Sequence, residues 1–174
     1  MAKNPFAFLF GRGGRSNAPI PLETQLAELE SCGIKPNPGV SLDDILLSFS
    51  RYDYENKPYE LLLTALGSQM KREPHPFMSD DIWHLDAECI EDHGSYKIIL
   101  ERIVKLTGGY LPLTHIEDFV DIEAEKAWMS FRLADKEYKW DARIDNDWLD
   151  EKILSKLVDL MKQNSCEKRL THLD

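Results

Sequence analysis

The alternation of hydrophobic and polar residues divides the chain into a helical first third and a remainder in which strands and helices are mixed. Leucines recur at helical spacing over 22–29, and Ser41 with Asp44 forms the Ser-x-x-Asp pattern of a capping box. The run 58–67 (PYELLLTALG) is apolar on nearly every side, which favours a buried helix. The polar segment 51–57 between these predicted helices is expected to be a loop.

Beyond the first third, strand-like and helix-like periods follow one another without a regular order. In 83–89, apolar side chains alternate with histidine and acidic ones, which is the period of a half-buried strand. A helix is expected over 96–106, followed by a loop that leads into a short strand. The alternating segments 127–133 and 138–144 predict a β-hairpin, and Asp147 is expected to cap a last long helix.

These elements predict an α+β fold, in which an antiparallel sheet with a β-hairpin in the C-terminal half is packed by about five helices. A length of 174 residues favours a single domain, here expected over 19–174. A flexible N-terminal arm, 1–18, is expected before it, because that segment is rich in glycine and carries basic but no acidic residues. Alternating phenylalanines at positions 6, 8 and 10 leave open an added edge strand.

The acidic balance of the chain bears on its partners. The net charge is −10, which argues against nucleic-acid binding and favours a cationic protein partner drawn in by long-range attraction. Three scattered cysteines form neither a disulfide framework nor a zinc motif, so a reducing cytoplasm is the expected compartment. The apolar run FAFLF is far shorter than the roughly 18 residues that span a bilayer, so neither membrane insertion nor secretion is expected.

No catalytic signature is present in the sequence. It contains no G-x-S-x-G motif, and its GRGG segment lacks the lysine and hydroxyl residue of a P-loop, so no catalytic residue and no cofactor is expected. His84, Asp86 and Glu88 alternate along one predicted strand face, with His93 nearby. Metal sites need three or four converging ligands, and a spacing alone does not show convergence. No metal ligand is therefore assigned, and a small metal-binding protein or enzyme that uses these four residues is the alternative.

Carboxylates gather around aromatic residues in three stretches, Ser79–Gly94, His115–Glu125 and Asp145–Glu151. Aromatic anchors surrounded by acidic residues are typical of an interface with a basic protein, because carboxylates steer the partner and pair with its arginines. The predicted partner-binding residues are Asp80, Asp81, Trp83, Asp86, Glu88, Glu117, Asp118, Asp121, Trp128, Asp145, Asp147, Trp148 and Asp150.

The aromatic residues differ in their expected exposure. Trp140 fits the inward alternation of its strand and is expected in the core. Trp128 has the opposite parity from its apolar neighbours, and Trp148 lies among aspartates ahead of the last helix. These two, with whichever of Tyr52 and Tyr54 is exposed, are the candidate anchors.

A small, acidic α+β protein without a catalytic motif resembles the immunity proteins of bacterial polymorphic-toxin and contact-dependent inhibition systems. The segments DDIWHLDAECIEDHGSY, LPLTHIEDFVDIE and KEYKWDARIDNDW also resemble a family of uncharacterised bacterial proteins. The first resemblance implies a non-enzymatic protein that binds one cognate toxin domain, often a basic nuclease, and covers its active site. It assigns no site residues. A regulatory adaptor protein is a further alternative, and the sequence does not predict an oligomeric state.

Overall fold

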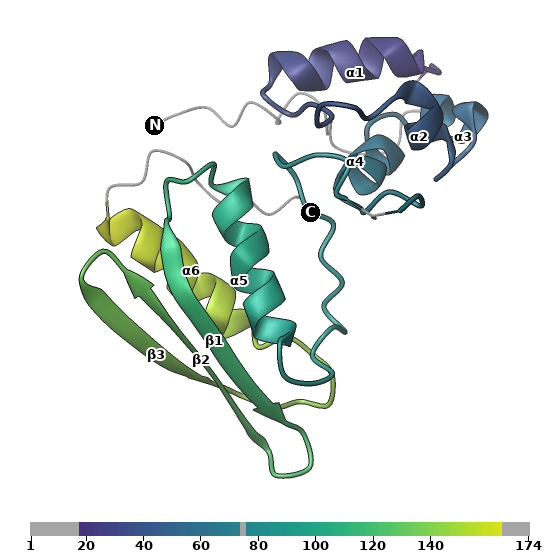
Figure 1. The fold of residues 1–174 in the computed structure, drawn as a ribbon. Coiled ribbons are helices and arrows are strands. Elements are labelled where there is room, and N and C mark those ends of the chain that lie inside the picture. Colours follow the sequence, from purple (N-terminus) through teal and green to yellow (C-terminus); the bar gives the residue numbers. More distant parts are fainter. Residues whose placement is uncertain (1–17, 74–75, 165–174) are drawn as a thin grey trace. The chain divides into compact units, whose positions relative to one another are not determined.

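Figure 1 shows the fold in a computed structural model, which describes residues 18–73 and 76–164. Helices and a three-stranded antiparallel sheet in the C-terminal half confirm the α+β class. The chain divides into two compact units, Met1–Leu85 (unit 1) and Asp86–Asp174 (unit 2). The expected arm, including its alternating phenylalanines, lies outside the described residues except for Ala18.

Unit 1 is built from helices. They are α1 (Leu22–Ser31), α2 (Leu42–Leu46), α3 (Arg51–Asn56) and α4 (Glu60–Leu66). α1 and α4 lie where the leucine pattern predicted them. The capping box of α2 is confirmed: the Ser41 hydroxyl accepts the N–H of Asp44 at 3.2 Å, and the Asp44 carboxylate accepts the N–H of Ser41 at 2.8 Å. These hydrogen bonds from Ser41, followed by one from Arg72, lower the pKa of Asp44 to about 2.

The prediction of a loop over 51–57 is wrong, because α3 occupies most of this segment. Ser50 caps the helix by accepting the N–H of Asp53 at 3.2 Å. Tyr54 is fully buried, and its hydroxyl donates to the Ile45 carbonyl at 2.7 Å. Tyr54 is the one buried residue of α3, and a search for apolar periodicity does not detect a helix with a single buried side chain.

A single buried glutamine ties three parts of unit 1 together. Gln25 donates to the carbonyls of Ile20 and Tyr54 at 2.8 and 2.9 Å, and it accepts the N–H of Tyr59 at 2.8 Å. A buried amide is tolerated only when its donors and acceptor are paired. Here the pairing fixes α1 against the ends of the segments that carry α3 and α4.

Unit 2 combines the sheet with two long helices. Its elements are α5 (Ser95–Leu106), β1 (Leu113–Asp121), β2 (Lys126–Leu133), β3 (Lys136–Ala142) and α6 (Glu151–Gln163). The sheet order is β1-β2-β3, and both neighbouring pairs are antiparallel. The predicted hairpin is confirmed as β2–β3, and the predicted helix over 96–106 as α5. β1 is a nine-residue strand rather than the short one expected.

The sheet has an inner and an outer face. The inner face carries the buried Met129 and Phe131 of β2 and, opposite Met129, the half-buried Trp140 of β3. α5 and α6 cover this face: Asp118 on it bonds to the start of α5, and Lys156 of α6 lies 5.5 Å from the Trp140 ring (Figure 1). Their apolar sides form the core of unit 2, as the alternation of the hairpin predicted.

The prediction of a strand over 83–89 is wrong. The exposure does alternate, since His84, Asp86 and Glu88 are exposed and the residues between them are half-buried. No ladder forms, however, and only Glu88 makes an isolated bridge, to Trp148. The alternation correctly indicated which side chains face solvent, but a strand in a sheet also requires a partner strand along its length.

The start of the last helix also differs from the prediction. α6 begins at Glu151, and its N-cap is Asp150 rather than Asp147. The Asp150 carboxylate accepts the N–H of Lys152 at 3.1 Å. Both aspartates precede an apolar helical period, so the sequence alone could not decide which of them is the cap.

Candidate functional site

Two of the predicted acidic stretches meet in unit 2, at residues 86–90 and 145–149, here called the acidic loop pair. The Leu149 N–H donates to the Ala87 carbonyl at 2.8 Å, and the Ile90 N–H donates to the Asp147 carbonyl at 2.9 Å. Between these bonds, Glu88 and Trp148 form their antiparallel bridge. Short strand-like pairing therefore holds together carboxylates that lie far apart in the sequence.

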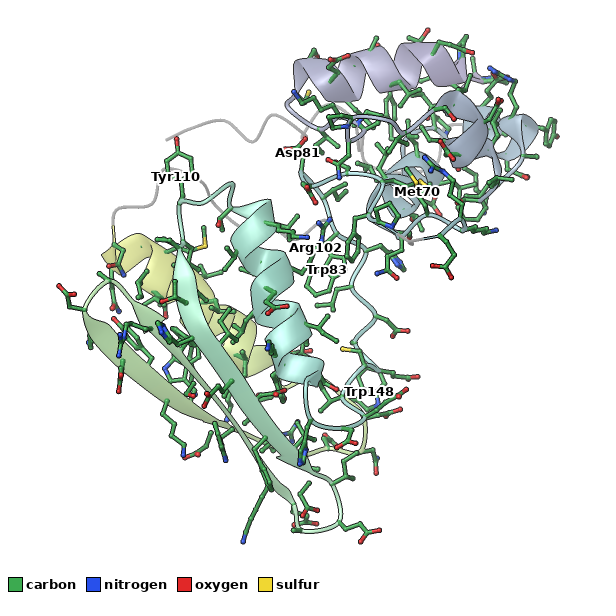
Figure 2. All side chains as sticks on the ribbon, in the orientation of Figure 1. Met70, Asp81, Trp83, Arg102, Tyr110 and Trp148 are labelled. Carbon is green, nitrogen blue, oxygen red and sulfur yellow. The ribbon has the colours of Figure 1, made fainter. Side chains whose placement is uncertain are left out.

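Trp148 is the exposed aromatic residue of the acidic loop pair (Figure 2). Its side chain is 49% exposed, which is unusual for so large an apolar group. Its N–H donates to the Asp145 carbonyl at 3.0 Å, which closes a tight turn with Asn146 at a φ of 52°. Asp145 is itself exposed and pairs with Arg143 at 3.0 Å. The turn thus presents an indole beside a carboxylate on a backbone held at both ends.

A hollow of about 460 Å³ lies at this turn. It is lined by Arg143, Asp145, Trp148, Leu149, Asp150, Glu151 and Lys152. Carboxylates and an indole face can hold a cationic side chain, by ion pairing and by cation–π attraction. The intramolecular pair of Arg143 with Asp145 already places a guanidinium against this lining.

The one cysteine in the acidic loop pair is not activated. Burial, followed by the negative charges of Asp86 and Asp147, raises the pKa of the Cys89 thiol. A nucleophilic cysteine needs the opposite environment, one that stabilises the thiolate. Asp86 and Asp147 belong to different segments of the acidic loop pair, so carboxylates from both segments lie near this thiol.

Three predicted partner-binding residues bond to the backbone of their own unit. The Asp118 carboxylate accepts the N–H groups of Gly94, Tyr96 and Lys97 at the start of α5. Asp150 is only 7% exposed and, besides capping α6, accepts the Arg143 N–H at 2.9 Å. Asp121 accepts the N–H of Ala124 at 2.9 Å and closes the turn after β1. These carboxylates serve backbone donors of the same unit.

Replacing Asp118 with alanine is expected to lower the free energy of unfolding by about 2 kcal/mol, because three helix-terminal N–H groups lose a charged acceptor. Urea unfolding measures the change. Glu117→Ala on the same strand is the matched control, since its side chain is exposed on the outer face, and it should be within about 0.5 kcal/mol of the wild type. Equal stabilities of the two variants would contradict the capping role.

The remaining predicted residues lie elsewhere. Asp80, Asp81 and Trp83 belong to unit 1, where the Asp81 carboxylate accepts the Lys35 N–H at 3.3 Å and the Trp83 ring meets Phe77 edge-on at 6.5 Å. Of the two tyrosines considered as anchors, Tyr52 is 73% exposed and Tyr54 is fully buried.

The outer face of the sheet carries Glu117 and Trp128. The Trp128 ring stacks on Phe119 at 6.1 Å, and the ammonium of Lys139 lies 4.1 Å from its centroid. The opposite parity of Trp128 correctly predicted that it does not face the core. Its ring is half-buried and already covered by neighbours, so it is a weaker anchor than Trp148.

The residues considered for metal binding are not assembled into a site. Among the described residues, no group of three His, Cys, Asp or Glu side chains is arranged to hold a metal ion. The His93 ring packs on Phe119 at 4.8 Å, and its Nδ1 accepts the Val120 N–H at 3.3 Å. This histidine therefore has a packing partner and a backbone partner within the sheet.

Arg143 is the residue of this surface that the sequence did not single out. It follows the last residue of β3, and its side chain both lines the hollow and pairs with Asp145. A basic residue two positions before an aspartate, near the end of a predicted strand, was the available signal.

No helix in the described part of the chain is long and apolar enough to cross a membrane. No protein-family model, curated protein or solved structure matches the chain.

Proposed function

We propose that the protein is a non-enzymatic acidic binding protein, and that it acts as an immunity protein that neutralises a cationic toxin domain by covering the active site of that domain. The observation that carries the proposal is the half-exposed indole of Trp148, set beside exposed carboxylates on a turn that the acidic loop pair holds in place. A rigid aromatic anchor with charged neighbours is the usual centre of a tight protein interface.

The mechanism follows from charge and geometry. A net charge of −10 draws a basic partner towards the surface, which raises the association rate. An arginine or lysine of the partner then lies against the Trp148 ring and pairs with Glu88 or Asp145. In a nuclease the same cations bind substrate phosphates, so carboxylates that occupy them exclude the nucleic acid.

Affinity capture tests the proposal. Extract from the native host is passed over the wild type and over the double variant Glu88→Lys/Asp145→Lys, which keeps the capping carboxylates intact. Glu123→Lys/Glu125→Lys, at two other exposed acidic positions of unit 2, is the matched control, because it makes the same change in net charge. We expect a basic protein to be retained by the wild type and by the control, to be released by salt, and to be absent from the double variant.

The captured protein then decides between the alternatives. If it is a toxin, an equimolar amount of the wild type should abolish its nuclease or growth-inhibiting activity, while the double variant should not. A captured protein whose activity is unchanged by saturating wild type would instead support a regulatory adaptor. Equal retention by the wild type and by the double variant would remove the acidic loop pair as the binding surface.

A further inference from the structure

The two edge strands of the sheet in unit 2, β1 and β3, differ in how far their outward-facing backbone groups are covered. Along β1, the register shifts between Thr114 and Glu117, with His115 at a φ of 51°, and farther along the Val120 N–H is taken by His93. A bulge and a covering side chain are common ways to prevent an edge strand from pairing with another chain.

The far end of β3 is covered as well. The carbonyl of Asp141 is approached by the ammonium of Lys156 at 3.5 Å, and the N–H of Arg143 donates to Asp150 at 2.9 Å. At both positions the backbone groups therefore point away from β2. Because these directions alternate along a strand, Glu137 and Lys139 also direct their N–H and carbonyl groups away from β2.

The remaining part of this edge, Lys136–Trp140, is the part of β3 next to the hairpin turn. In the sheet of the described residues, β3 has β2 as its only strand neighbour, and the pairing between them is regular, without a bulge. The side chains at positions 136, 137 and 139 are exposed. An open, regular edge is a template for a further antiparallel strand.

We propose that this edge pairs with the same edge of a second copy of the chain, antiparallel and centred on Tyr138, so that the protein forms a two-fold symmetric dimer through a continuous six-stranded sheet. The order of charges along β3 favours this register. In this register each Glu137, which pairs with Arg132 of its own chain at 2.6 Å, also lies opposite the other copy's Lys139, and the two-fold axis forms this pair twice. On the inner face, each Lys136 lies opposite the other copy's Trp140, which suits a cation–π contact.

The neighbouring registers are less favourable. Centring the pair on Glu137 places two Glu137 carboxylates opposite each other, and centring it on Lys139 places two ammonium groups opposite each other. A register centred on Trp140 would match Lys139 with Asp141, but it requires the backbone of Asp141 and Arg143, which Lys156 and Asp150 already occupy. In the Tyr138 register the like-charge pair is Asp135 with Asp141, at the end of the paired segment.

The dimer proposal does not depend on the binding function proposed above. Sedimentation velocity over a concentration series tests it. The wild type is expected to show a monomer–dimer equilibrium. Glu137→Lys and Lys139→Glu should each weaken it by about tenfold or more. The double swap Glu137→Lys/Lys139→Glu should dimerise more tightly than either single variant, because it re-forms both opposite-charge pairs between the copies. It should remain weaker than the wild type, because Glu137 also pairs with Arg132 of its own chain at 2.6 Å. Asp141→Lys should leave the equilibrium unchanged or strengthen it.

A backbone variant gives a second readout. Lys139→Pro removes an N–H that points away from β2, so it should abolish the dimer while circular dichroism and the melting temperature stay close to the wild type. A wild type that remains monomeric at every concentration would overturn the proposal. So would a double swap that dimerises no more tightly than the single variants. A dimer weakened by Asp141→Lys would replace the Tyr138 register with the Trp140 register.

Discussion

Replacing Gly67 with alanine is expected to lower the free energy of unfolding by about 3 kcal/mol. A Cβ atom at this position would lie 2.4 Å from the backbone nitrogen of His84 and 2.9 Å from the carbonyl carbon of Trp83. Backbone atoms cannot rotate away as a side chain can, so the whole segment around Trp83 and His84 must move. That movement breaks the hydrogen bond from the His84 N–H to the Gly67 carbonyl, now 2.9 Å long.

The backbone conformation of Gly67 separates this effect from strain. Gly67 is the C-cap of α4 with a φ of −75°, which alanine adopts freely. Without the contact, the substitution would stabilise the protein slightly by restricting the unfolded chain. Gly33→Ala is the matched control: Gly33 has a φ of 90° and nothing within 4 Å of its added Cβ, so only strain of about 1 kcal/mol is expected. Urea unfolding of both variants checks the difference, and a Gly67 variant as stable as the wild type would show that the segment is not held against α4.

Much of the fold could be predicted from the sequence because it follows from local patterns. The hairpin required only two alternating segments and a short connection, and the capping box of α2 is a four-residue signal. α3 was not predicted, because its one buried residue, Tyr54, packs against α2. A periodicity search over a polar segment does not detect such a contact. Local patterns predict elements well when the element carries its own apolar face.

The segment 83–89 shows what a local pattern cannot predict. Its alternation correctly predicted exposure, yet it has no partner strand beyond the single bridge of Glu88 to Trp148. Whether an alternating segment joins a sheet depends on a neighbour elsewhere in the chain, and the sequence of the segment does not contain that information.

The same limit applies to the candidate site. The sequence offered thirteen acidic and aromatic residues of one apparent kind, but the structure separates them by their partners. Asp118 accepts the N–H of Gly94, the N-cap of α5, which lies 24 residues earlier in the chain, and Asp150 is buried at the start of α6. Only pairing between distant segments distinguishes such carboxylates from Asp145, which is exposed beside Trp148.

Replacing Trp148 with alanine is expected to raise the dissociation constant for the basic partner by about 30-fold or more, which corresponds to a loss of about 2 kcal/mol. The indole is half-exposed in the free protein, so its remaining surface is available for burial by the partner. Its loss should act mainly on the dissociation rate, because anchors hold a formed complex, whereas Asp145→Lys should act mainly on the association rate and its salt dependence.

Two variants make this prediction specific to the anchor. Trp148→Phe keeps a ring in the same place and should retain most of the affinity. Trp128→Ala removes an indole from the outer face of the sheet, where the ring already stacks on Phe119 and lies under Lys139, and it should leave the dissociation constant within about threefold of the wild type. Surface plasmon resonance with the captured partner measures all of these rates. If Trp148→Ala binds as tightly as the wild type while Trp128→Ala does not, the interface lies on the outer face of the sheet, and the acidic loop pair contributes only long-range attraction.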